Sequence, residues 1–166
     1  METSTVSLII AVIAFLLSVA ALLKKPPVPE APSTGMPEGS KLKLQAYERL
    51  VLLTERIALP NLITRLSQPG ISAFEMKVIL TENIKQEFEY NSTQQLYVSP
   101  VSWDAVRNLK EQNIMIVNKI AEMLPPEASG ADLNKKIIEL MMAQQGSSLH
   151  EMVLEALNFE AKKLMQ

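Results

Sequence analysis

The feature that most constrains this chain is an uninterrupted apolar run near its N-terminus. Residues 6–23 (VSLIIAVIAFLLSVAALL) carry no charged side chain, and Lys24 and Lys25 follow them directly. As an α-helix, a run of this length spans roughly 27 Å, close to the hydrocarbon thickness of a bilayer. We therefore predict a single N-terminal transmembrane helix, with residues 1–24 as the anchor.

The charges around this run predict its orientation. Glu2 is the only charged side chain before it, whereas Lys24 and Lys25 follow it. Because positive flanking charge stays on the cytoplasmic side, we expect the N-terminus outside and the C-terminal domain in the cytoplasm. A cleaved secretory signal, with Ser18-Val19-Ala20 at the cleavage site, is the alternative. It is disfavoured because the basic n-region is missing and the apolar stretch is too long.

Small residues recur along one face of the predicted span. Their spacing alternates between four and three residues, and small side chains allow transmembrane helices to approach closely. The pattern predicts self-association of the span; the alternative is that Ala and Ser fall there by chance. The residues are Ser7, Ala11, Ala14, Ser18 and Ala21.

A proline-rich linker is expected at residues 25–40, because five of the ten prolines lie between positions 26 and 37. Such a segment favours an extended, solvated spacer. Residues 41–166 then form one domain of ordinary size. Two of the 16 basic residues and three of the 18 acidic residues precede position 41. The domain therefore keeps 14 basic and 15 acidic residues and is close to neutral. Nucleic acid is therefore not an expected partner, and the absence of cysteine excludes disulfides and thiolate chemistry.

The spacing of apolar residues predicts an all-α domain, a bundle of about five helices. One helix is expected over 41–59, with a short restart from Pro60 to Leu66, and another over 102–124 with Ser102 as N-cap. Three more begin at capping pairs three residues apart: Ser72 with Glu75, Ser129 with Asp132, and Ser148 with Glu151. The helix after Ser72 is expected to run through a stripe formed by Phe74, Val78, Thr81, Ile84 and Phe88.

Groups with recognisable catalytic or metal-binding spacing are missing. His150 is the only histidine, no phosphate-binding glycine loop is present, and the chain has five glycines. We expect no cofactor and no metal, and a protein that is not an enzyme. The alternative is a cytoplasm-facing enzyme whose site is built from Glu, Asn, Gln and Tyr side chains without a recognised motif.

Two groups of residues are candidates for a protein interface. Glu48-Arg49 and Glu55-Arg56 repeat seven positions apart, so they share one strip of a helix; the alternative is an ordinary solvated face. Amide and aromatic side chains, which are typical of interfaces, form the second group. Its members are Gln94, Gln95, Tyr97 and Trp103, and for the last two the alternative is that they fill a helix junction.

These residues carry a resemblance as well. The segments Gln45-Ala46-Tyr47-Glu48-Arg49-Leu50, Gln94-Gln95 and Tyr97-Val98-Ser99, together with Trp103, are similar to an uncharacterised family of small single-pass membrane proteins of Bacteroidetes. The resemblance covers roughly residues 41–120 and the N-terminal span. It implies a bacterial inner membrane with the domain in the cytoplasm, and it implies no activity.

The sequence thus predicts a membrane-tethered helical adaptor. Its expected partners are the lipid bilayer, a membrane or cytoplasmic protein of unknown identity, and a second copy through the transmembrane helix. A flat or grooved patch would favour this hypothesis, whereas a deep pocket lined by convergent polar groups would favour the enzyme.

Overall fold

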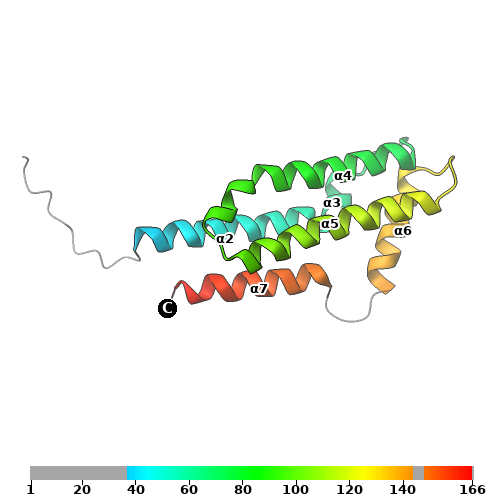
Figure 1. The fold of residues 1–166 in the computed structure, drawn as a ribbon. Helices are drawn as coiled ribbons and strands as arrows, with labels where there is room; N and C mark the ends of the chain where they lie inside the picture. Colours follow the sequence, from blue (N-terminus) through cyan, green and yellow to red (C-terminus); the bar gives the residue numbers. More distant parts are fainter. Residues whose placement is uncertain (1–36, 144–147, 166) are drawn as a thin grey trace, which may run out of the picture. The chain divides into compact units, whose positions relative to one another are not determined.

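The computed structural model describes residues 37–143 and 148–165, which belong to one compact unit, Met36–Gln166. Within these residues the chain forms six α-helices, one short 3-10 helix and no strand, which confirms the all-α prediction (Figure 1). The sixth is the short helix expected from Pro60 to Leu66, which begins one residue earlier, at Leu59. The elements are α2 (Glu38–Ile57), α3 (Leu59–Leu66), α4 (Ala73–Tyr90), η1 (Ser92–Leu96), α5 (Pro100–Met123), α6 (Gly130–Ala143) and α7 (Leu149–Lys163).

None of the helices in this described part is long and apolar enough to cross a membrane. The predicted span at residues 6–23 and the anchor at 1–24 lie outside the described residues. So do the five small residues predicted to pack in the membrane, which are Ser7, Ala11, Ala14, Ser18 and Ala21.

Helix α2 begins at Glu38, so the predicted linker end at residue 40 is three residues too late. Pro37 precedes the helix, and its carbonyl oxygen accepts hydrogen bonds from the amides of Ser40 (2.8 Å) and Lys41 (3.1 Å). Gly39 and Ser40 are weak helix formers. The two hydrogen bonds to Pro37 hold the first turn in spite of these residues. Because residues 38–40 resemble the linker in composition, the sequence did not show that the helix begins at Glu38.

Among the described residues, four long helices (α2, α4, α5 and α7) surround the core. Helix α2 packs against α4, α5 and α7, and α4 lies along α5. The short α3 and α6 pack together and against α4, and Figure 1 shows α6 crossing the end of the bundle. Because α2 has neighbours on several sides, it is apolar on more than one face. The core includes Leu50, Leu53 and Ile57 of α2, Met76, Leu80 and Ile84 of α4, Val106 and Val117 of α5, Ile137 of α6 and Leu157 of α7.

The expected capping pairs start three of the helices. Ser72 and Glu75 form a complete capping box at α4, and Ser148 with Glu151 does the same at α7. At α6 the Asp132 carboxylate accepts from the amide and hydroxyl of Ser129. Each box satisfies amides that a helix start leaves without partners.

The expected N-cap of the longest helix is wrong. Helix α5 starts at Pro100, and its cap is Ser99, whose Oγ accepts from the amide of Ser102 at 3.2 Å. Proline is favoured in the first turn of a helix because its missing N–H would have no partner there. Pro100 therefore opens this helix instead of separating it from the preceding turn.

Helices α4 and α6 start side by side. The amide of Ala73 donates to the carbonyl of Ala128 at 2.9 Å, and that of Gly130 donates to Ile71 at 2.8 Å. A Cβ atom at Gly130 would lie 3.0 Å from Cγ1 of Ile71, so this close approach favours glycine.

Candidate functional site

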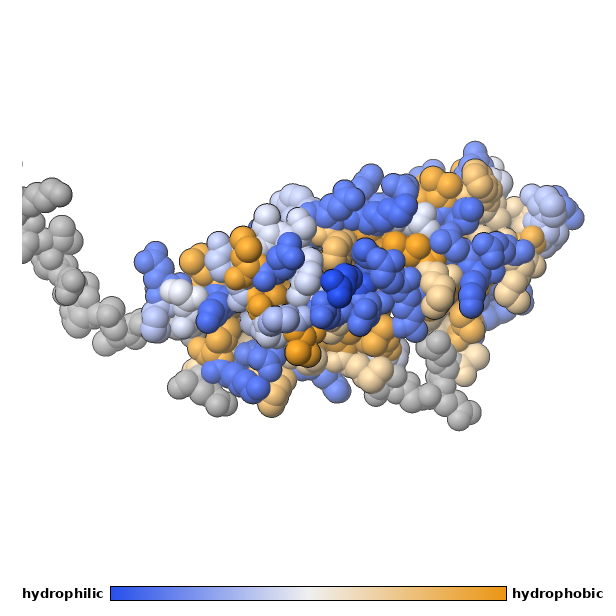
Figure 2. All heavy atoms as spheres, in the orientation of Figure 1, coloured by the Kyte–Doolittle hydropathy of each residue, from blue (hydrophilic) through white to orange (hydrophobic). Residues whose placement is uncertain are grey.

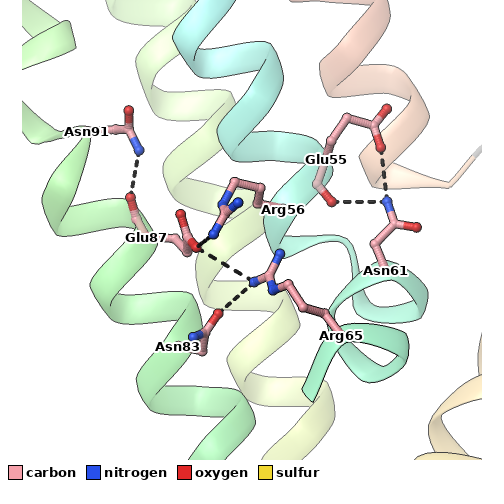
Figure 3. Close-up of polar contacts among 7 residues, drawn as sticks. All are labelled: Glu55, Arg56, Asn61, Arg65, Asn83, Glu87 and Asn91. Carbon is pink, nitrogen blue, oxygen red and sulfur yellow. Dashed lines mark hydrogen bonds and ion pairs between the residues drawn. The ribbon is translucent and has the colours of Figure 1, made fainter. Parts of the chain in front are cut away.

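The two members of the second Glu-Arg pair point to different neighbours. Arg56 reaches Glu87 of α4, whereas Glu55 accepts a hydrogen bond from Asn61 of α3 (Figure 3). Adjacent helix residues differ in direction by about 100°, so a pair that is continuous in sequence serves two surfaces. The predicted single strip of charge is thus divided between the α4 side and the α7 side of α2.

Glu87 is the centre of the larger polar cluster. Its Oε1 pairs with the guanidinium of Arg56 and lies 3.6 Å from that of Arg65 on α3. Arg65 also donates to Asn83, one turn earlier on α4, at 2.7 Å (Figure 3). The Glu87 side chain is 14% exposed, and the two arginines that contact it compensate its negative charge. The hydrogen bond to Glu87 raises the pKa of Arg56, which stays positively charged.

Arg49 is held at the other end of the same face. Its Nε donates to Oδ1 of Asn91 at 3.4 Å, and its guanidinium lies 5.4 Å from the centre of the Tyr90 ring. Asn91 is buried, and its Nδ2 donates to the backbone carbonyl of Glu87 at 2.8 Å. Asn91 therefore links Arg49 to the α4 turn that carries Glu87.

A groove of about 720 Å³ lies between these two helices. We call it the α2–α4 groove; it is lined by Arg49, Leu52, Leu53, Arg56, Asn83, Gln86, Glu87, Tyr90 and Asn91. Within it, Arg49, Leu52 and Arg56 form one ridge of α2, which we call the arginine ridge. Leu52 is 58% exposed between the two cations. The groove is therefore cationic along α2 and rich in amides along α4.

Glu55 belongs to a second, smaller cluster near α7. Asn61 donates to both the backbone carbonyl and Oε2 of Glu55, each at 3.0 Å. Nε2 of His150 lies 3.6 Å from the same Oε2, and it is buried with no hydrogen-bond partner among the described residues. A cavity of about 510 Å³, lined mainly by apolar side chains, adjoins His150. Nowhere in the described part do three His, Asp or Glu side chains gather as metal ligands would.

The amide and aromatic candidates divide by burial. Trp103 is 9% exposed and its ring centre lies 4.9 Å from that of Phe88, which matches the alternative in which it fills a helix junction. Gln94 is buried as well, whereas Gln95 and Tyr97 are exposed. Leu96 is also exposed, so η1 presents apolar as well as polar side chains.

Apolar side chains reach the surface elsewhere too. Figure 2 shows them interspersed with polar residues over the face of the bundle in view. Large exposed examples are Val101, Met115 and Met123 on α5, Met142 on α6, and Phe159 on α7.

The sequence pointed to part of this site. Arg49 and Arg56 were among the interface candidates and line the groove, and Glu48 is exposed beside them. Leu52, Asn83 and Asn91 were not singled out. An apolar residue one turn from each of two arginines was a readable signal for Leu52, but nothing local predicts which residues of α4 face α2.

The comparison with protein families places the chain. The model of a family of unknown function, DUF7935, matches residues 3–164, so the chain belongs to this family. This finding confirms the expectation of an uncharacterised family, whereas the Bacteroidetes source and the motif stay predictions. No curated protein and no solved structure matches the chain.

Proposed function

We propose that the protein is a helical adaptor, held at a membrane by residues 1–24, that binds another protein through its folded domain. The observation that carries the proposal is the α2–α4 groove. It places an exposed leucine between two positioned arginines and faces them with amide side chains of α4. Exposed apolar, arginine and aromatic groups together are typical of protein interfaces.

The state of the polar groups favours binding over catalysis. Glu87 already accepts from Arg56 and lies close to Arg65, so two guanidinium groups occupy its carboxylate. A general base must reach its substrate with a free carboxylate oxygen. Arg56 and Arg65 instead keep part of their donors for a ligand, because Glu87 contacts one nitrogen of each guanidinium. We therefore propose that the groove binds and does not catalyse.

The tether is proposed from the sequence. The apolar run at 6–23, Lys24 and Lys25, and the proline-rich segment after them support an anchor in the bacterial inner membrane with the domain in the cytoplasm. An anchor with a short spacer raises the local concentration of the domain near membrane-bound partners. Contact between the small residues of two spans would bring two domains together.

Crosslinking of the full-length protein in its own membranes tests this function. An amine-reactive crosslinker should join a second protein to Lys85, which is exposed on α4 beside the groove residues, more than to Lys136 on α6. Replacing residues 6–23 by an unrelated transmembrane helix should retain that partner, whereas deleting residues 1–24 should reduce its yield. Crosslinks confined to Lys136, or none to another protein, would contradict the proposal.

A further inference from the structure

We propose that the α2–α4 groove receives an acidic amphipathic segment of the partner protein, with an apolar side chain against Leu52 and carboxylates on Arg49 and Arg56. This inference rests on the adaptor function and adds the chemistry of the partner.

The first step is the spacing of the arginine ridge. Arg49, Leu52 and Arg56 stand at positions i, i+3 and i+7 of α2, so their side chains align on one face of the helix. Leu52 is apolar yet 58% exposed, and it lies about one turn from each arginine. The complementary surface is an apolar side chain with a carboxylate on either side. An amphipathic helix in a groove offers such a pattern.

The second step is charge. Three arginines meet at this site, since Arg65 joins Arg49 and Arg56, and Glu87 is the only carboxylate among the lining residues. One carboxylate leaves positive charge uncompensated there, although the chain as a whole carries a formal charge of −2. Complementary charge across an interface favours the correct partner and its orientation.

The third step is positioning before binding. Arg56 is held by Glu87, and Arg49 by Asn91 and the ring of Tyr90. A long side chain that is already ordered loses less conformational freedom when it binds. Planar guanidinium groups also match carboxylates with two parallel hydrogen bonds. The ridge is therefore prepared for carboxylates at two fixed places.

A protein segment fits this site better than an anionic lipid surface. Glu48, Glu82 and Glu89 are exposed on the same two helices, and they would repel a broad negative surface. Amide side chains such as Asn83 and Gln86 line the wall opposite the ridge and offer hydrogen bonds to a peptide backbone. A narrow segment that lies between the helices satisfies both sets of groups.

Photo-crosslinking in native membranes tests the inference. A photo-reactive amino acid replaces Gln86 in the full-length protein, because Gln86 is exposed and lines the groove without belonging to the ridge. The same substitution at Asn108, exposed on α5, is the positional control. The crosslinked peptide at position 86 should carry Asp or Glu about one helical turn from an apolar residue on both sides.

Two variants connect the adduct to the ridge. Arg49→Gln and Leu52→Asp should each lower the yield at position 86 about tenfold, as expected when an interfacial charge pair or apolar contact is lost. Arg107→Gln is the matched control, because Arg107 is an exposed arginine of α5 that pairs with Asp104. A charge exchange should restore the adduct: Arg49→Glu in this protein is combined with a lysine in place of the acidic residue of the partner that contacts it.

The outcomes separate the two proposals. A lipid adduct, with binding to phosphatidylglycerol vesicles that Arg49→Gln removes, would overturn the acidic partner. A neutral or basic peptide at position 86, or an adduct insensitive to Arg49→Gln, would also overturn it and leave an adaptor in place. Circular dichroism melting of each variant shows that its fold is retained. If no crosslinker position in the domain yields a protein adduct, both the inference and the adaptor function fail.

Discussion

Nδ2 of Asn113 on α5 donates a hydrogen bond of 2.8 Å to the backbone carbonyl of Ile57, the last residue of α2. The chain turns at Ala58 and continues as α3. No amide of a further α2 turn therefore donates to the carbonyl of Ile57. Asn113 is 5% exposed and supplies the missing donor. One buried side chain therefore satisfies a helix end and fixes the register of α5 against α2.

We expect Asn113→Leu to lower the free energy of unfolding by about 1–3 kcal/mol, because it leaves a buried carbonyl without a donor. Denaturant unfolding monitored by circular dichroism measures the change. Asn108→Leu is the control, since Asn108 is exposed on the same helix. Equal stability of the Asn113 variant and the wild-type protein would show that this bond does not contribute.

Local signals predicted where most helices begin. Ser72 and Ser148 were recognised because a capping box requires only residues three positions apart, and such short-range rules hold regardless of the rest of the fold. Asn113 also stands out in the sequence, because it is a polar residue on an apolar stripe of its helix. A buried amide side chain needs a hydrogen-bond partner. Ser99 was not predicted as a cap, because the helix was expected to begin three residues later with Ser102 as its N-cap.

Which face of a helix is buried was harder to predict. Of the stripe expected along α4, Thr81 and Ile84 are buried, but Phe74 and Val78 are exposed. Ala73, Met76 and Leu80 are buried instead, since α5 and α6 cover that side. The α4 sequence carries apolar residues on several sides, so its periodicity alone does not choose between them.

The candidate site shows the same limit. Arg56 and Glu87 are 31 residues apart in the chain, and their contact depends on how α2 and α4 are aligned. The charged repeat on α2 was visible in the sequence, but its division between two surfaces was not. Tertiary packing decides which charges meet.

Acid should weaken the domain through its helix caps. The backbone amide and hydroxyl of Ser72 lower the pKa of Glu75, and the hydroxyl and amide of Ser129 lower that of Asp132. A carboxylate with a lowered folded-state pKa stabilises the protein above its unfolded pKa, about 4 for these groups, and this contribution is lost as the pH falls through the folded value. We therefore expect Glu75→Gln and Asp132→Asn to be destabilising at pH 7 and nearly neutral well below pH 4.

Denaturant unfolding over a pH series measures this effect. Glu155→Gln, an exposed change in the middle of α7, is the control for a carboxylate away from a helix start. A destabilisation by Glu75→Gln that is the same at both ends of the series would contradict the role given to the caps.

The orientation of the domain is a prediction from Lys24 and Lys25. A reporter that is active only in the cytoplasm should function when fused after Gln166, because positive flanking charge is retained on that side. Replacing both lysines by glutamate should reduce its activity, whereas changing Lys162 and Lys163 should not. A mature protein that begins near Ala21 would instead indicate a cleaved signal.

Self-association of the predicted span depends on its small residues. Ala14→Leu should weaken it, because a bulky side chain separates helix backbones that pack through small ones. Replacing Ile13, the neighbouring residue off the small face, by leucine should have little effect. A membrane two-hybrid measurement of residues 1–24 compares them; equal effects at both positions would refute a specific small-residue contact.

The domain should fold without the N-terminal residues. A fragment of residues 36–166 includes Pro37, whose carbonyl accepts the first amides of α2, and it contains the whole compact unit. We expect it to be predominantly helical by circular dichroism and to unfold in one cooperative transition. A fragment that starts at residue 41 lacks Glu38, Gly39 and Ser40, the first turn of α2, and should be slightly less stable. Because that turn lies outside the buried core, the difference should be below about 1 kcal/mol. Aggregation of the longer fragment, or a gradual transition without a baseline, would show that the domain needs residues 1–35 to fold.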